Sequence, residues 1–180
     1  MNSLETLKSH NKSHNDIKPQ NYLVKFPENK SDLNNIEIVL TDFGMAGPDT
    51  KGGTPIFSSP ESYAGKERKI NVDVFSLGRV FLFLILTDKQ FLEFLYIPMD
   101  KFEKKEIKNI IESDGVLTLI IKMMISNPKN RVIENDSLQY FQKRSKNLTF
   151  ENIKKISRIV ETVLCTEINA YVENLKNHIS

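Results

Sequence analysis

The sequence lacks the marks of a disulfide-rich, metal-rich or membrane-spanning protein. With one cysteine, Cys165, it has no internal disulfide and no cysteine-rich metal site, and its three histidines do not cluster with acids at ligand spacing. Its polar first residues lack the apolar core of a signal peptide. The one long apolar run, residues 80–86, is much shorter than the roughly 20 residues that span a bilayer. We therefore expect an intracellular protein, located in the cytoplasm and without a membrane partner.

The sequence also has almost no net excess of charge of either sign. Lysine and arginine number 25 against 23 acids, so the formal net charge is only +2. A protein that binds nucleic acid through phosphate contacts usually carries a marked basic excess, and we expect no nucleic-acid partner here. The hydrophobic fraction of 39% is ordinary for a globular protein with one real core.

Two short segments near the start have the composition of β-strands. Residues 21–26 and 36–41 are rich in β-branched and aromatic side chains, and a polar connection joins them. Residues 44–55 hold four glycines and two prolines, which is typical of a loop. The pattern predicts a hairpin followed by a loop.

Helical periodicity covers most of the remaining chain. Residues 72–86 are apolar almost all round, which predicts a buried core helix. Helical spacing continues over 104–113 and 115–126, and the proline within 127–131 breaks it. Residues 149–179 predict one long amphipathic helix, with Thr149 as its expected N-cap. Its apolar stripe requires cover, either from the chain itself or from a coiled-coil partner.

The first motif is "SHNDIKPQN" at residues 13–21, which has the pattern His-x-Asp-x-Lys-x-x-Asn. Taken alone it could be a polar loop, since an aspartate is more often a turn residue than a base. An Asp-Phe-Gly triplet follows the second predicted strand at residues 42–44. "SPE" at 59–61, "DVFSLG" at 73–78 and "NPKNR" at 127–131 complete the series.

These five motifs, in this order, resemble the eukaryotic protein kinase family of serine/threonine type. The resemblance implies a mainly α fold with a small β hairpin, similar to the carboxy-terminal lobe of that family, over residues 1–141. Residues 142–180 are expected to be a helical carboxy-terminal extension. No glycine-rich phosphate loop and no Val-Ala-x-Lys strand occurs in the sequence, so the amino-terminal lobe is missing from it.

The resemblance assigns chemical roles to five side chains. Asp16 would accept the proton of the substrate hydroxyl, and Lys18 would meet the γ-phosphate of ATP. Asn21 and Asp42 would supply oxygen ligands to Mg²⁺, which prefers oxygen donors together with phosphates. Thr54 would hydrogen-bond both Asp16 and Lys18. Lys18 and Thr54 also imply a protein substrate with a serine or threonine hydroxyl.

Other residues would hold the site in place. His14 and Phe43 would stack in an internal apolar column, with Gly44 completing the triplet that contains Phe43. Asp73 would accept backbone hydrogen bonds from the loop around Asp16.

Further residues would line or brace the lobe. Glu61 and Arg131 resemble the buried ion pair of the family. Leu23 would form the lower face of the adenine pocket. Val80 and Leu84 would support it from below, although both could equally be plain core residues.

The clearest departure from the family pattern is Asn15. Many kinases have an arginine there, which holds a phosphorylated loop by charge-assisted hydrogen bonds that asparagine cannot make. Between Asp42 and Glu61 only Thr50 precedes Thr54 as a hydroxyl residue, so control by loop phosphorylation is not expected.

Two classes of function remain open from the sequence. The first is a protein kinase with an intact carboxy-terminal lobe, whose amino-terminal lobe lies upstream in a longer chain or is lost from the gene model; that lobe or another chain is then a possible partner. The second is a catalytically silent scaffold or interaction module derived from a kinase. Retention of Asp16, Lys18, Asn21 and Asp42 favours the enzyme, whereas the missing lobe favours a scaffold and predicts that this chain alone is inactive.

Overall fold

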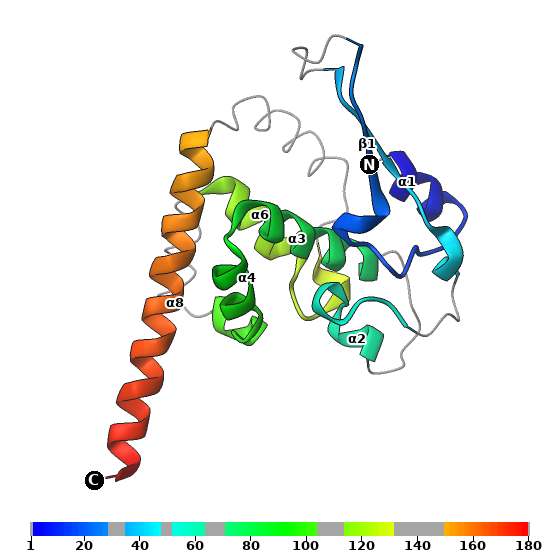
Figure 1. Cartoon of the computed structure of the whole chain (residues 1–180). Helices are drawn as coiled ribbons and strands as arrows, with labels where there is room; N and C mark the ends of the chain where they lie inside the picture. The colour runs from blue at the N-terminus through cyan, green and yellow to red at the C-terminus, as the bar shows by residue number, and fades with distance from the viewer. Residues whose placement is uncertain are drawn as a thin grey trace. The chain divides into compact units, whose positions relative to one another are not determined.

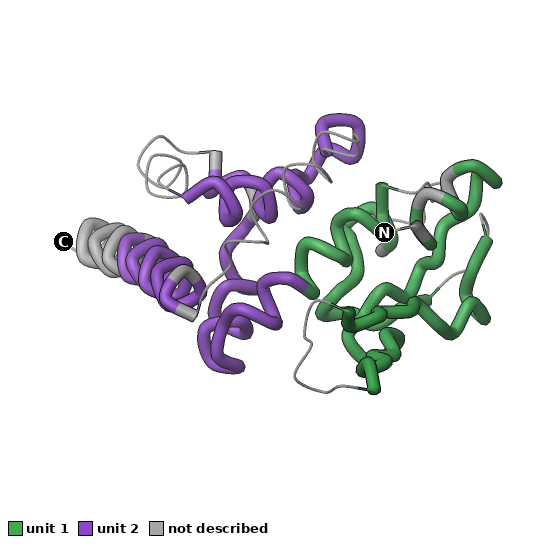
Figure 2. Tube along the Cα trace, turned by 90° about the horizontal axis from the view of Figure 1, so that it is seen from above, with its two compact units in different colours: residues 1–80 green, residues 81–180 purple. Residues whose placement is uncertain are grey.

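The computed structural model describes residues 2–28, 35–47, 52–63, 71–103, 114–131 and 150–179. These residues are mostly helical, with one two-stranded antiparallel sheet, as the sequence predicts (Figure 1). The chain divides into two compact units, Met1–Val80 and Phe81–Ser180 (Figure 2). No helix in the described part of the chain has both the length and the apolar character needed to cross a bilayer.

The hairpin of the first unit consists of strands β1, Tyr22–Lys25, and β2, Glu37–Leu40. Tyr22 pairs with Leu40, and Lys25 pairs with Glu37. The predicted strands are thus confirmed, each a little shorter than its composition suggests. Both lie in the part of the chain that also carries the first two motifs.

The other elements of the first unit are short. They are helix α1, Asn2–Ser9, the 3-10 turns Pro19–Asn21, Phe43–Met45 and Pro55–Phe57, and helix α2, Pro60–Tyr63. Two of these turns begin with proline, whose fixed φ suits a first helical position. The segment predicted as a loop over 44–55 therefore overlaps a 3-10 turn at each of its two ends.

The core helix α3, Asn71–Ile85, confirms the prediction for residues 72–86. Residues 72–78 are all buried, including Phe75 at 0% exposure. The prediction is wrong at Leu84, which is 66% exposed and is therefore not a core residue. An apolar side chain predicts burial only where another element packs on that side of the helix, and among the described residues none does so closely at Leu84.

The second unit is built from helices α4, Asp88–Leu95, α6, Gly115–Met123, and α8, Phe150–Ile179. The 3-10 turns Met99–Glu103 and Pro128–Asn130 complete it. Asp114 caps α6 by accepting from the amides of Val116 and Leu117, and α6 ends three residues before the predicted limit of 126. The helix predicted at 104–113 lies outside the described residues.

Helix α8 confirms the long helix predicted at the carboxy-terminal end, while its expected cap, Thr149, lies outside the described residues. Ile156, Val160 and Val163 are at most 1% exposed. Helix α4 packs against α8, and Ser157 Oγ donates to Gln90 Oε1 at 3.0 Å. This part of the stripe is therefore covered within the chain itself.

Candidate active site

A buried carboxylate on α3 anchors the loop that contains the first motif. Asp73 is fully buried, and its two oxygens accept from the amides of His14 at 2.7 Å and Asn15 at 2.9 Å. Asp73 also affects Tyr22 at the start of β1. Burial, and after it the negative charge of Asp73, raises the pKa of Tyr22 to about 12. Asp73 therefore fixes the backbone immediately before Asp16.

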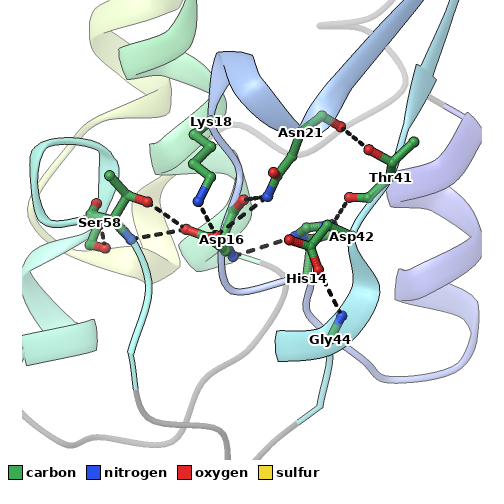
Figure 3. A network of polar contacts seen from close by, with 9 residues as sticks. His14, Asp16, Lys18, Asn21, Thr41, Asp42, Gly44 and Ser58 are labelled. Atoms are coloured by element: carbon green, nitrogen blue, oxygen red, sulfur yellow. Dashed lines mark hydrogen bonds and ion pairs between the residues drawn. The ribbon is translucent and has the colours of Figure 1, made fainter.

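The carboxylate of Asp16 is the centre of the polar network in Figure 3. Its Oδ1 accepts from the Thr54 hydroxyl at 2.8 Å and the Thr54 amide at 2.9 Å. Its Oδ2 accepts from Lys18 Nζ at 2.6 Å and, at 3.3 Å, from Asn21 Nδ2. Asn21 Nδ2 also donates to the Asp16 carbonyl at 2.8 Å. The structure thus brings four predicted site residues together.

One predicted contact differs. Thr54 was expected to hydrogen-bond both Asp16 and Lys18, but among the described residues no direct bond joins Thr54 to Lys18. Each binds a different oxygen of Asp16. The carboxylate lies between them and accepts from both sides, so the two donors meet only through it.

Opposing effects act on the pKa of Asp16. Burial by itself raises this pKa, whereas the hydrogen bonds from Lys18 and Thr54, together with the positive charge of Lys18, lower it. The lowering effects outweigh burial, and the net pKa lies below the ordinary value of 3.8. Asp16 is therefore ionised at neutral pH.

This lowered pKa predicts how stability depends on pH. Because the folded pKa lies below the unfolded one, the stabilisation from ionised Asp16 is present above pH 3.8 and is lost as the pH falls through the folded value. We expect the difference in melting temperature between the wild type and Asp16→Asn to be largest near neutral pH and to shrink below pH 3.8. Thermal denaturation from pH 7 to pH 3, in steps, measures it. A constant difference over this range would contradict the lowered pKa.

The hairpin brings the two predicted metal ligands to neighbouring strand ends. Asn21 directly precedes β1, and Asp42 follows β2 by two positions. Between them, the Thr41 amide and hydroxyl both donate to the Asn21 carbonyl, at 2.8 and 3.1 Å. Asp42 is exposed and has a left-handed backbone, with φ 60° and ψ 67°. Its Oδ1 accepts from the Gly44 amide at 3.4 Å, and its side chain is accessible.

The aromatic pair of the motifs is also in contact. The rings of His14 and Phe43 have centroids 5.0 Å apart, and His14 Nε2 lies 2.9 Å from the Thr41 carbonyl oxygen. Phe43 is nevertheless 47% exposed. At Gly44 a Cβ atom would lie 3.3 Å from Asp42 Oδ1, so a larger residue would crowd the carboxylate.

The residues expected near adenine have different environments. Leu23 is 61% exposed on β1, so its side chain is accessible for contact with a ligand. Val80 is buried on α3, which is compatible with plain core packing, whereas Leu84 is exposed.

The residues expected to form a buried ion pair are each buried. Glu61 lies on α2 of the first unit, and Arg131 lies in the second. Within its own unit, Arg131 donates from Nε to the Ile125 carbonyl at 2.7 Å. The pairing of Glu61 with Arg131 stays a prediction.

Two residues make contacts that were not anticipated from the sequence. Arg79 on α3 lies over the Phe75 ring at 4.8 Å and donates to the carbonyl of Ile56, two positions after Thr54, at 2.8 Å. Asn15 donates to the carbonyls of Met45 and Gly47. The only available signals were an arginine within an apolar helix and an asparagine in the place of an arginine, and neither identifies its partner.

Comparison with known proteins agrees with the motif pattern. The family model described as protein kinase domain matches residues 1–142. The chain is 31% identical to the mitogen-activated protein kinase kinase mkk2 of Aspergillus fumigatus over 152 residues, covering 78% of this chain and 27% of that protein. It is 28% identical to human serine/threonine-protein kinase DCLK3 over 171 residues, covering 82% and 25%.

A third relative is the Aurora kinase of Saccharomyces cerevisiae. The identity is 31% over 143 residues, which cover 73% of this chain and 36% of that kinase. The chain therefore spans about a quarter to a third of the length of these relatives.

Proposed function

The chain belongs to the protein kinase family, and from this premise we propose that residues 1–141 form the carboxy-terminal lobe of a serine/threonine kinase. The proposed reaction transfers the γ-phosphate of ATP to a serine or threonine hydroxyl of a protein. The observation that carries the proposal is the convergence of Lys18, Asn21 and Thr54 on the carboxylate of Asp16. Phosphoryl transfer depends mainly on positioning and charge stabilisation, and this cluster offers both.

Asp16 is proposed to orient the substrate hydroxyl and to accept its proton. Its lowered pKa keeps the carboxylate ionised at neutral pH, so it can accept a hydrogen bond from the incoming hydroxyl. The bonds from Thr54 to Oδ1 hold the carboxylate in one orientation. A base that is fixed in this way loses little freedom when the substrate binds.

Lys18 is proposed to stabilise negative charge on the transferred phosphoryl group. Its ammonium lies 2.6 Å from Asp16 Oδ2 and keeps part of its surface accessible, with a side-chain exposure of 23%. A cation held beside the base is well placed to attract the phosphate. Lys18 together with Thr54 also supports serine or threonine as the acceptor residue.

The residues near Asp42 fit a magnesium ion bound together with phosphates. Mg²⁺ is usually held by one or two carboxylates and substrate phosphates, and not by an all-protein cage. Consistently, the described residues contain no group of three or more histidine, cysteine, aspartate or glutamate side chains that could hold a metal by themselves. Asn21 uses its Nδ2 toward Asp16, which leaves its Oδ1 as the candidate ligand atom, together with the exposed carboxylate of Asp42. When bound, the ion would neutralise phosphate charge.

Binding of a fluorescent ATP analogue tests this proposal. We expect Mg²⁺ to tighten binding of the analogue to the full chain. Asp42→Asn is expected to weaken this Mg²⁺-dependent binding by at least about tenfold, because even an outer-shell partner of a metal typically contributes about 10–100-fold. Asp100→Asn removes an exposed carboxylate from the second unit and serves as the matched control. Titrations with Mg²⁺ and with EDTA separate the metal-dependent part.

The second candidate is a scaffold or interaction module without catalysis. The exposure of Leu23 and Phe43, at 61% and 47%, favours it, because these apolar side chains are accessible to another protein. If the wild type is normally folded and shows no Mg²⁺-dependent nucleotide binding, this result supports the scaffold over the enzyme.

A further inference from the structure

Asn15 has a backbone conformation and a side-chain environment that the kinase resemblance does not explain. It lies next to Asp16 with a left-handed φ of 69° and is 7% exposed. Asparagine tolerates this conformation better than most residues. Its side-chain nitrogen donates to the carbonyl oxygens of Met45 at 2.8 Å and Gly47 at 2.7 Å. It also donates, at the longer distance of 3.4 Å, to the carbonyl oxygen of Ser13.

These bonds hold the segment that follows Asp-Phe-Gly. The amide of Gly47 also donates to the Ser13 carbonyl at 3.0 Å, so backbone and side chain act at the same place. Met45 is only three positions after Asp42. Fixing Met45 and Gly47 therefore limits the positions that Asp42 can take.

The far end of the same loop also approaches Asn15. Gly53 has a φ of +104°, and a Cβ atom there would lie 2.7 Å from the Asn15 carbonyl oxygen. Only glycine permits so close an approach. Asn15 therefore contacts residues on both sides of the part of the loop that lies outside the described residues.

The hydrogen-bond pattern of the side chain shows which of its atoms matters. Within the described part of the chain, Asn15 Oδ1 is buried without a hydrogen-bond partner, whereas Nδ2 makes two short bonds. A buried acceptor without a partner is unfavourable, so the two donor bonds must account for the orientation of the amide.

We propose that Asn15 is a positioning residue, whose side-chain amide holds the segment after Asp-Phe-Gly by neutral hydrogen bonds and so positions Asp42 without a phosphate on the loop. The neutral side-chain amide makes these bonds to carbonyls that are already present, so the contact needs no charged partner. The role of this positioning in catalysis rests on the proposed kinase function, but the hydrogen bonds from Asn15 to Met45 and Gly47 can be tested independently.

The test is amide hydrogen exchange, resolved by NMR, on the full chain. Asn15→Asp keeps the shape of the side chain and removes its N–H donors. Asn15→Gly removes the side chain and tolerates the left-handed backbone. In both variants we expect the Gly47 amide to lose about tenfold in protection, which matches the loss of one or two hydrogen bonds. The Thr41 amide, which is bonded to Asn21, is expected to stay unchanged and reports on the hairpin.

A pH series separates the donor role from a merely structural one. In Asn15→Asp the new carboxyl faces carbonyl oxygens and regains a donor when it is protonated, so Gly47 protection is expected to recover as the pH is lowered toward 5. Asn15→Gly has no such group and is not expected to recover. The nearby titratable residues, His14, Asp16 and Asp73, are common to both variants, so the comparison removes their effects.

Three results would overturn the proposal: unchanged protection of Gly47 in both variants, equal loss at Gly47 and Thr41, or recovery in Asn15→Gly as well. Nucleotide binding is judged separately. Local loss of protection without any Mg²⁺-dependent binding in the wild type would leave the holding contact established and the kinase activity refuted. Unchanged protection with normal binding would refute the contact alone.

Discussion

Replacing Asp73 with alanine is expected to lower the free energy of unfolding by about 3–6 kcal/mol, since each hydrogen bond to a charged group contributes about 1.5–3 kcal/mol. Asp73 is fully buried and accepts from the amides of His14 and Asn15. Without it, both amides lose their partner in the interior. In a chain of this size the melting temperature is expected to fall by roughly 10 °C. Urea denaturation followed by circular dichroism measures the change.

Ser76→Ala is the matched control for this prediction. Ser76 is also buried on α3, but in the described part of the chain its hydroxyl bonds only within the helix, to the Val72 carbonyl at 3.0 Å. Its loss is expected to cost about 1 kcal/mol or less. Asp73→Asn, which keeps the shape and one acceptor, gives the measurement if the alanine variant does not fold. If Asp73→Ala is no more costly than Ser76→Ala, the anchoring role is wrong.

The 180-residue chain assayed alone is expected to transfer phosphate hardly faster than its Asp16→Asn variant. The groups around Asp16 are in place, but none of the seven glycines in this sequence forms a glycine-rich phosphate loop, and Leu23 is 61% exposed. ATP would therefore be held on one side only. Positioning can contribute about 7–11 kcal/mol in a well-oriented reaction, and most of that contribution is expected to be absent.

A radiolabelled phosphate-transfer assay with Mg²⁺ and a generic basic protein substrate measures this activity. Asp16→Asn is the control, because it removes the proposed base and keeps the shape of the side chain. Robust turnover by the wild type that disappears in this variant would show that the 180 residues suffice, or that a second copy of the chain completes the site.

Much of the local structure follows from the sequence because it depends on neighbours along the chain. β-branched and aromatic residues predict the strands, and apolar spacing predicts α3 and α8. The hairpin then requires Asn21 and Asp42 to lie at adjacent strand ends, and the structure places them there. The motif order was sufficient to identify the family, which the comparisons confirm.

Only the tertiary structure decided which atoms meet across long stretches of sequence. The resemblance to the kinase family implied that Asp16 belongs with Lys18 and Thr54, but not that the two donors bind different oxygens. Asparagine at position 15 indicated the loss of a phosphate contact, whereas its bonds to the carbonyls near Gly47 depend on how two loops pack.

Burial shows the same division. Leu84 has the apolar side chain of a core residue and is exposed, while the stripe of α8 around Val160 is covered by the packing of its own unit. The sequence by itself determined the two strands, helices α3, α6 and α8 and the family, because these depend on local periodicity and on the order of the motifs, and the family resemblance supplied the polar residues expected at the site. The tertiary structure decided their partners and their exposure, because these depend on which surfaces pack together when the chain folds.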